Sequence, residues 1–237
     1  MNGILTKGGK RYFITFIDDS SSFCYVYLLK TKDEVIHYFK AYKAEVENQL
    51  ERKIKRLRSD RGGEYFSNDF DDFCVEYGII HDRTLPFSPQ SNRITERKNH
   101  TLTELVNVML NTEGLSKEWW GEAILTMCHV LSRVPTKNKE ITPFKEWEKK
   151  RINLLYLCTR GFLAKVNVPI NKKHKLGPKT IDCVFLGYDF HSVGYRILII
   201  KSDVPGMLIL SWNLETQHSL RMSSACGIHL VKQVMRL

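Results

Sequence analysis

Two carboxylates, Asp60 and Glu96, stand at positions from which they could bind a divalent cation. Asp60 follows a short apolar and basic run, residues 54–57, that predicts a strand, and a Gly-Gly turn comes after it. Its carboxylate is therefore expected at the C-terminal end of a strand, where ligands gather in α/β sheets. Glu96 begins a helical pattern, and a carboxylate from a neighbouring helix would complete an oxygen site for a hard cation. Taken singly, each residue is more often a turn or capping residue.

The short sequence motifs around these two residues resemble those of one family. Residues 58–65 read Arg-Ser-Asp-Arg-Gly-Gly-Glu-Tyr, and residues 88–99 read Ser-Pro-Gln-Ser-Asn-Arg-Ile-Thr-Glu-Arg-Lys-Asn. Between Asp60 and Glu96 lie 35 residues, 61–95. In this order and at this spacing, the words resemble the second and third acids of the D,D-35-E integrase core of copia-type retrotransposons.

The resemblance implies a ribonuclease-H-like α/β core that carries out metal-assisted phosphodiester chemistry on DNA, namely 3′-end processing and strand transfer. Two Mg²⁺ or Mn²⁺ ions would clamp the attacking and leaving oxygens. Carried over residue by residue, Asp60 and Glu96 would be the catalytic and metal-binding acids. The residues expected to contact DNA are Asn92, Lys98, Asn99 and His100.

The first acid of the family has no evident counterpart. Asp18 and Asp19 match a family word that ends strand 2, and a strand of six or seven residues at about 3.3 Å each places that end about 20 Å from the site. They are therefore expected to be turn and capping residues. The family carries its first acid shortly before the word Gly-Gly-Lys-Arg-Tyr-Phe, which here is residues 8–13. We therefore expect an N-terminally truncated core that lacks strand 1 and the first acid. Without them, the chain is not expected to carry out strand transfer.

Composition favours a polyanionic partner. The 237 residues include 36 Lys and Arg against 26 Asp and Glu, a net charge of +10 with a pI of about 9.3, which suits nucleic acid. The six cysteines lack zinc-finger spacing and no disulfide framework is indicated, so a reducing compartment fits best. No apolar run of about 18 residues and no signal peptide is evident. The expectation is an intracellular protein, nuclear or cytoplasmic, with no membrane partner.

Hydrophobic periodicity predicts elements that alternate in type. Residues 11–18 and 23–30 predict a hairpin buried on both faces, and Thr31 to Glu34 open a helix with an apolar face, Val35, Phe39, Tyr42 and Val46. Strands are predicted at 54–60 and 79–85, and helices near 68–77, at 94–112 and at 116–133. In the helix at 94–112, the predicted buried stripe is Leu102, Leu105, Val106 and Met109. Its polar face is Glu96, Asn99, His100 and Thr103.

The chain is predicted to contain two modules. Residues 1–135 are expected to form the integrase core and 136–155 a linker, which Phe144 and Trp147 could fasten to the core. Residues 156–205, with short strands between Phe162 and Ile200, suggest a small barrel and resemble the SH3-like module that follows the core in copia-type polyproteins. Residues 206–237 depart from the family. Codons for residues 212–222 can be chosen so that translation in a shifted reading frame gives a sequence motif of the family. This leads to the hypothesis that the tail is frameshifted.

The sequence is consistent with two functions that belong to different classes of protein. The first is a retrotransposon integrase fragment that keeps the DNA-facing helix and the basic character but not strand transfer. The alternative is a catalytically silent DNA-binding or interaction module. A ribonuclease H acting on RNA–DNA hybrids shares the fold class but fits poorly, because Glu96 follows the Pro-Gln-x-Asn loop and precedes Arg-Lys-Asn. Family integrases work as multimers, so the resemblance also implies a homo-oligomer.

Overall fold

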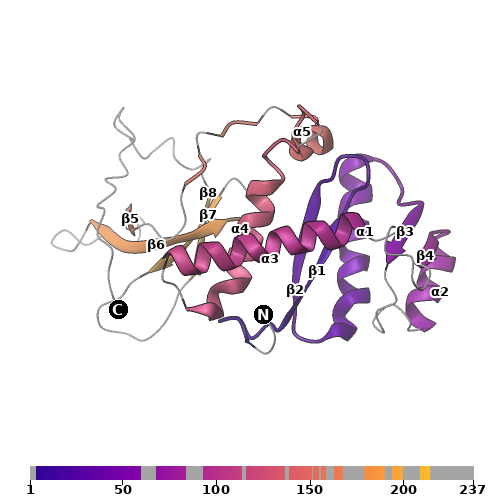
Figure 1. Cartoon of the computed structure of the whole chain (residues 1–237), viewed down its shortest axis with the longest axis horizontal. Helices are drawn as coiled ribbons and strands as arrows, with labels where there is room; N and C mark the ends of the chain where they lie inside the picture. Colours follow the sequence, from indigo (N-terminus) through magenta and orange to yellow (C-terminus); the bar gives the residue numbers. More distant parts are fainter. Residues whose placement is uncertain are drawn as a thin grey trace.

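The computed structural model describes residues 4–59, 68–83, 93–113, 116–136, 139–150, 152–154, 156–158, 163–167, 179–189, 194–199 and 209–213. In these ranges helices and strands alternate from residue 35 to residue 113, three helices in all then follow one another to residue 148, and the described strands form two two-stranded sheets and one four-stranded sheet (Figure 1). This mixed α/β arrangement agrees with the predicted class. Of the helices in these ranges, none has the length and apolar character needed to cross a membrane.

The predicted hairpin is confirmed as β1 (Tyr12–Ile17) and β2 (Cys24–Leu29), which pair antiparallel. Alternate side chains of β1 point to opposite faces, as the period of two in a strand requires. Ile14 and Phe16 pack in the cluster that contains α1 (Val35–Leu50), whereas Phe13 and Ile17 pack against the cluster that contains α3 (Arg93–Glu113) and α4 (Trp120–Leu131). The hairpin is therefore covered on both faces.

The next helix, α1 (Val35–Leu50), follows a short 3-10 turn, η1 (Lys32–Glu34). Its buried residues are the four predicted from the period, Val35, Phe39, Tyr42 and Val46. Two short strands, β3 (Arg56–Ser59) and β4 (Ile80–Arg83), pair in parallel, and α2 (Asn68–Glu76) lies between them in the sequence. Both strands begin later than predicted, β3 at Arg56 and β4 at Ile80, and their predicted last residues lie outside the described ranges.

The two long helices that follow, α3 (Arg93–Glu113) and α4 (Trp120–Leu131), pack on each other, with η3 (Lys117–Trp119) between them. Leu102 and Val106 of α3 are fully buried, as predicted. Leu105 and Met109, the other two predicted members of the stripe, are only partly buried, and Leu110, outside the predicted stripe, is buried.

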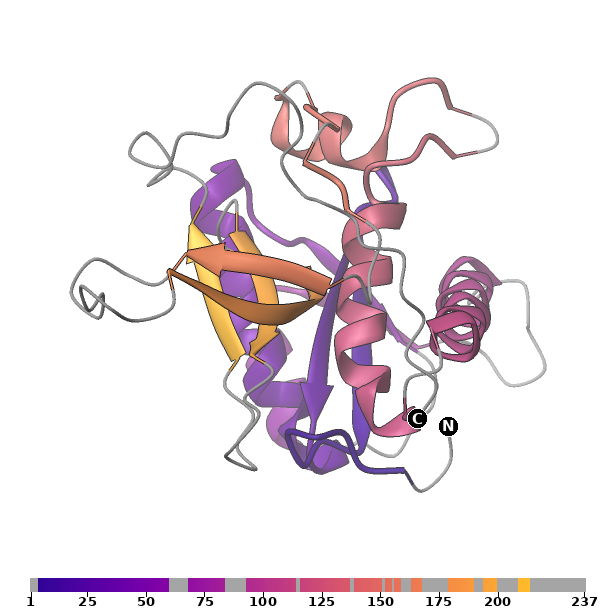
Figure 2. The ribbon, with the colours of Figure 1, turned by 90° about the vertical axis from the view of Figure 1, so that its left-hand side faces the viewer.

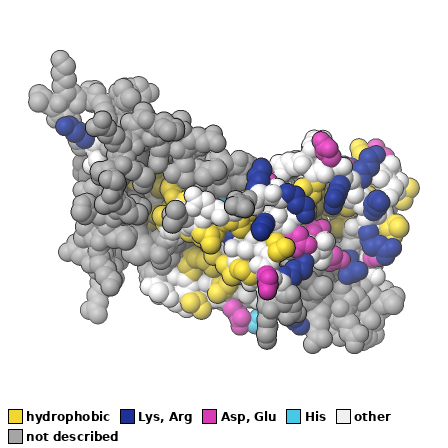
Figure 3. Space-filling model, turned by 90° about the horizontal axis from the view of Figure 1, so that it is seen from above, with side chains coloured by type: hydrophobic (Ala, Val, Ile, Leu, Met, Phe, Trp, Pro, Cys, Tyr) yellow, Lys and Arg dark blue, Asp and Glu magenta, His cyan; other side chains and the backbone are white. Residues whose placement is uncertain are grey.

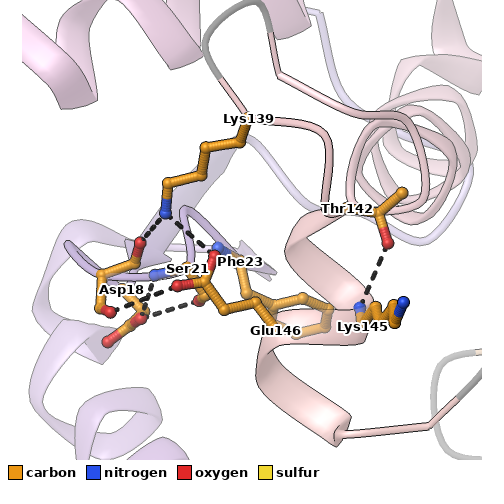
Figure 4. A network of polar contacts seen from close by, with 8 residues as sticks. Asp18, Ser21, Phe23, Lys139, Thr142, Lys145 and Glu146 are labelled. Carbon is orange, nitrogen blue, oxygen red and sulfur yellow. Dashed lines mark hydrogen bonds and ion pairs between the residues drawn. The ribbon is translucent and has the colours of Figure 1, made fainter.

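A short helix, α5 (Pro143–Glu148), lies in the segment predicted as a linker and packs on the core. The indole ring of Trp147 stacks on Phe23 with centroids 5.2 Å apart. Lys139 donates to the backbone oxygen of Ser20 and to Glu146 Oε2, the latter at 2.9 Å, which joins this segment to the β1–β2 turn (Figure 4). The stacking of Trp147 on Phe23 and the contacts of Lys139 with Ser20 and Glu146 hold α5 against the hairpin.

The four-stranded antiparallel sheet lies beside α4 (Figure 2). Its strands, in spatial order, are β5 (Leu163–Asn167), β6 (Thr180–Tyr188), β7 (Gly194–Ile199) and β8 (Ile209–Asn213). Thr126 Oγ1 lies 3.1 Å from the backbone oxygen of Leu186, and Arg196 pairs with Glu122 at 2.6 Å. A Cβ added to Gly187 would lie 2.1 Å from Thr126 Oγ1, so only glycine permits this close approach. The strand β8 belongs to residues 206–237, the predicted tail.

Candidate functional site

A cleft of about 950 Å³ separates the two short sheets. One wall is β1 and the other is β3 with the residues before it, while the buried side chains of α1 form the floor. Thr95 and Asn99, from the first turns of α3, also line it. Within the described part of the chain, β1 pairs only with β2 and β3 only with β4, so no strand fills the space between them.

The elements that carry both predicted acids border this cleft. Asp60 itself lies outside the described residues, but Ser59, the residue before it, ends β3 and lines the cleft. Glu96 is exposed in the first turn of α3, next to Thr95, which also lines the cleft. Glu96 thus lies near the start of a helix, as predicted, and the described strand that precedes Asp60 in the sequence is β3.

The residues predicted to contact DNA are not all on one face of α3, and Asn92 lies outside the described residues. His100 has a side chain that is 73% exposed, and its Nδ1 lies 3.3 Å from Glu104 Oε2. Asn99 Oδ1 accepts a hydrogen bond of 2.8 Å from Thr15 Oγ1, which fastens α3 to β1.

Lys98 lies apart from these residues. It is partly buried and lies four positions before the fully buried Leu102, so the helical period places it away from the exposed His100. Its positive charge lowers the pKa of buried Cys24, although the hydrogen bond with Cys128 and burial together raise that pKa more strongly. The helical period alone could have separated Lys98 from His100.

The two aspartates excluded from the predicted site have local roles. Asp18 Oδ2 accepts hydrogen bonds from the backbone nitrogen and the hydroxyl of Ser21, each 2.7 Å, as expected of a turn residue. Asp19 Oδ2 lies 3.7 Å from Arg58 Nη1, an exposed pair across one part of the cleft. The predicted turn role of Asp18 is confirmed.

A chain of hydrogen bonds that the sequence did not reveal supports the end of β3. Ser59 Oγ lies 2.8 Å from His81 Nε2, and His81 Nδ1 lies 3.1 Å from Asp71 Oδ1. Arg83 donates to the other oxygen of Asp71, and this hydrogen bond is the main reason why the pKa of Asp71 is lowered. Because Ser59 is only 6% exposed, we interpret the chain as a structural tie between β3, β4 and α2 rather than as a nucleophile with its base.

Carboxylates line the described part of the cleft, but they are not grouped as metal ligands. Among the residues that the structure describes, no group of three or more His, Cys, Asp or Glu side chains is arranged to hold a metal ion. Glu96 is the one predicted acid in these ranges, and its carboxylate is the ligand type that Mg²⁺ takes.

Basic side chains gather near the cleft. In the view from above, Lys and Arg lie over the end of the molecule formed by α1, β3 and β4, with some acidic side chains among them (Figure 3). The exposed basic residues at the β3 wall are Arg52, Lys53, Lys55, Arg56 and Arg58. Arg56 and Arg58 have carboxylate neighbours, Asp82 at 2.7 Å and Asp19 at 3.7 Å.

Two family models match the chain in succession. The integrase core domain matches residues 2–89, and the retroviral polymerase SH3-like domain matches residues 163–204. The second match covers β5, β6 and β7.

Curated relatives are Pol polyproteins of plant transposons. The chain is 43% identical over 195 residues to the retrovirus-related Pol polyprotein from transposon TNT 1-94 of Nicotiana tabacum, an alignment that covers 82% of this chain and 15% of that protein. It is 29% identical over 200 residues to the Pol polyprotein from transposon RE2 of Arabidopsis thaliana, covering 84% of this chain and 14% of that protein. The chain thus spans a small part of these relatives.

Solved structures with a similar arrangement are retroviral. The simian T-cell lymphotropic virus intasome in complex with PP2A regulatory subunit B56 gamma aligns with a TM-score of 0.48 and 17% identity, covering 84% of this chain and 69% of that one. The HTLV-2 integrase catalytic core domain in complex with magnesium, in its trimeric form, aligns with a TM-score of 0.44 and 18% identity, covering 57% of this chain and 83% of that one. Because both TM-scores are below 0.5, these structural similarities do not assign the chain to a family. The family is assigned from the sequence matches.

Proposed function

Because residues 2–89 belong to the integrase core family and residues 163–204 to the retroviral polymerase SH3-like family, we propose that this chain is a DNA-binding segment of a copia-type retrotransposon integrase. The observation that carries the proposal is the succession of both matches in one chain of net charge +10. Basic residues at the β3 wall and the exposed first turns of α3 supply a surface for phosphates.

In this proposal the site is short of carboxylates. Asp60 and Glu96 would hold Mg²⁺ or Mn²⁺ through their oxygens, and a bound ion would polarise the phosphate and activate the attacking oxygen. Asp18 is engaged by Ser21 and Asp19 is next to Arg58, so neither supplies an uncommitted third ligand. Mg²⁺ demands near-octahedral oxygen coordination and dehydrates reluctantly, so two carboxylates hold it weakly. Strand transfer is therefore expected at background.

On the DNA side, His100 offers an exposed ring, and Asn99 holds α3 at its angle to β1 through Thr15. Asn92, which precedes α3 in the sequence, is proposed to contact the DNA as well. Lys98, which is partly buried, is proposed to act through its charge near that surface rather than through a direct base contact.

The catalytic part of the proposal is tested by a strand-transfer assay on the purified chain with Mg²⁺ and with Mn²⁺. The expected product level is that of a protein-free reaction, and Asp60→Asn and Glu96→Gln leave it unchanged. Calorimetric titration of Mg²⁺ should give a weak heat for the chain and a smaller one for each variant, because each variant removes one of the two proposed carboxylate ligands. Robust product that Asp60→Asn abolishes would refute the shortage of carboxylates.

The alternative, a catalytically silent DNA-binding module, also predicts no strand-transfer product above background. DNA binding is therefore measured separately. Anisotropy with duplexes of unrelated sequence should show affinity that falls linearly on a log–log plot against salt. His100→Glu should weaken binding severalfold, whereas Thr112→Glu, exposed near the other end of the same helix, should not. Binding insensitive to salt would count against DNA as the partner.

Assembly is the remaining part of the proposal. The structural relatives include an intasome and dimeric and trimeric core domains. We propose that this chain also forms a homo-oligomer, which sedimentation velocity over a concentration series would detect as a rising mean mass.

A further inference from the structure

Two cysteines from distant parts of the sequence meet in the core. Cys24 begins β2 and Cys128 lies in the last turn of α4, which packs on β2. The thiol of Cys128 donates a hydrogen bond of 3.0 Å to the backbone oxygen of Cys24, and the two side chains are in hydrogen-bonding contact as well. A disulfide requires that the backbones of its two cysteines be neighbours, and here one thiol touches the backbone of the other residue.

The other cysteines that the structure describes have different neighbours. The sulfurs of Cys158 and Cys183 contact backbone oxygens and, for Cys158, a tyrosine hydroxyl. Cys74 is buried in the cluster that contains α1 and α2. Among the described cysteines, Cys24 and Cys128 are therefore the pair placed for a reaction between two thiols.

A cavity gives a small reagent access to this pair. Both cysteines line a cavity of about 510 Å³ between β2, α1, α4 and α5. Gln49 and Lys150, which are exposed, also line it, so the cavity opens to solvent. One molecule of liquid water occupies about 30 Å³, so a reagent nearly as small as water can enter. It can thus reach thiols that are themselves only 1% and 2% exposed.

The charges around the pair set how fast the thiols react. The thiolate, not the thiol, is the nucleophile. The hydrogen bond with Cys128 and burial raise the pKa of Cys24, whereas the positive charge of Lys98 lowers it in part. Arg133, a second cation, lines the same cavity. Because the thiolate of Cys24 is scarce, we expect the pair to react over minutes to hours rather than within seconds.

We propose that Cys24 and Cys128 form a redox site at which hydrogen peroxide converts the two thiols into a disulfide between β2 and α4. One thiolate attacks a peroxide oxygen, the O–O bond breaks, and a sulfenic acid and one molecule of water result. The second thiol then attacks the sulfenic sulfur, so that the S–S bond forms and a second molecule of water leaves. Two thiols are thereby oxidised and one peroxide is reduced, and a dithiol reductant reverses the reaction.

The disulfide would join two parts of the molecule covalently. The strand β2 belongs to the hairpin, whereas α4 contacts the four-stranded sheet through Thr126 and His129. The bond closes a loop over residues 25–127, and a long closed loop removes much conformational freedom from the unfolded chain. The midpoint of thermal unfolding should therefore rise by about 5–10 °C on oxidation.

The experiment uses the full 237-residue chain, reduced, freed of reductant and treated with hydrogen peroxide. Remaining thiols are blocked with iodoacetamide, and the chain is digested with trypsin without reduction. Cys24 falls in the tryptic peptide 12–30 and Cys128 in the peptide 118–133, and neither peptide contains another cysteine. Mass spectrometry should find these two peptides joined with the loss of two hydrogens, and dithiothreitol should separate them. In concentrated urea their yield should fall at least about fivefold, because the native contact is absent.

Variants connect the bond to stability. Cys128→Ala should abolish the joined peptides and the rise in the unfolding midpoint. The matched control Cys183→Ala removes a fully buried cysteine of β6 and should keep both. Each variant is compared with its own reduced form by differential scanning fluorimetry, so that any general loss of stability from the missing sulfur cancels.

Three results would overturn the proposal. The first is that peroxide leaves both thiols unlinked or carries them to sulfinic acids. The second is that the main product joins either cysteine to a different one, within the chain or between chains. The third is that the oxidised chain unfolds at the same temperature as the reduced chain or below it. The proposal does not rest on DNA binding or strand transfer, so failure of either leaves it standing.

Discussion

A fall in pH from about 7 to about 5 is expected to destabilise the fold through one residue, His129. Its ring stacks on Tyr188 of β6 with centroids 4.4 Å apart and planes at 12°, and its Nε2 lies 2.9 Å from Tyr156 Oη. Burial lowers the pKa of His129 to about 3, with a further contribution from the positive charge of Arg133. The residue is therefore neutral in the folded protein and joins α4 to the four-stranded sheet.

The sign follows from comparing the folded and unfolded states. An unfolded chain protonates a histidine near pH 6.5, whereas the folded chain keeps His129 neutral down to about pH 3. Its stabilising contribution is complete above about pH 6.5 and is lost as the pH falls from there toward 3. At about 1.4 kcal/mol per pH unit, the free energy of unfolding should fall by about 2 kcal/mol between pH 7 and pH 5.

The assay is urea unfolding followed by tryptophan fluorescence at pH 7, 6 and 5, for the unaltered chain and for His129→Phe. Phenylalanine keeps a ring on Tyr188 but cannot titrate, so the variant should lose about 2 kcal/mol less over this range. His37→Phe, at an exposed position of α1, should keep the pH dependence of the unaltered chain. Equal slopes for the unaltered chain and His129→Phe would refute the reasoning.

Two further substitutions test other contacts. Gly187→Ala should destabilise by about 1–3 kcal/mol through overpacking, because its Cβ would lie 2.1 Å from Thr126 Oγ1. Thermal unfolding measures the loss, and adding Thr126→Ala should recover part of it, since the remaining Thr126 Cβ is 3.4 Å away. Asp71→Asn should destabilise at neutral pH by at most about 1 kcal/mol, because its partly exposed carboxylate is screened by solvent. As the pKa of Asp71 is lowered, this difference should close as the pH falls below about 4, which urea unfolding at pH 7 and pH 3 would show.

Each of these predictions has a matched control. Gly8→Ala adds the same methyl group where the nearest atom, Thr6 Oγ1, is 3.8 Å away, so it should be nearly neutral. Asp72→Asn removes an exposed carboxylate from the same helix, α2, and should change stability little at either pH. A Gly8→Ala loss as large as that of Gly187→Ala, or an Asp72→Asn difference equal to that of Asp71→Asn, would contradict the contacts named above.

Much of the fold could be predicted from the sequence because the signals were local. The period of two in residues 12–17 and the period near 3.6 in residues 35–46 fixed which side chains of β1 and α1 are buried. The order of strands and helices followed from the same periods. Short strands such as β3 were less well bounded, because four residues carry little pattern.

The candidate site was predictable in part. The words around Asp60 and Glu96 indicated a strand end and a helix start, and β3 and α3 have those positions. Lys98 was grouped with His100 because both belong to one sequence motif, and the structure adds that Lys98 is partly buried whereas His100 is exposed. The helical period of residues 98–102 already separates the two side chains, but the motif of the family groups them together.

What the sequence by itself determined is the list of elements, their buried faces and the basic character of the chain. Only the tertiary structure decided which of them meet: Ser59 with His81 and Asp71, Gly187 with Thr126, and the cleft that lies between β1 and β3. The physical reason is that periodicity records which side of an element is covered, whereas the partner that covers it lies tens of residues away. Such contacts depend on the shapes of both surfaces, which no local pattern encodes.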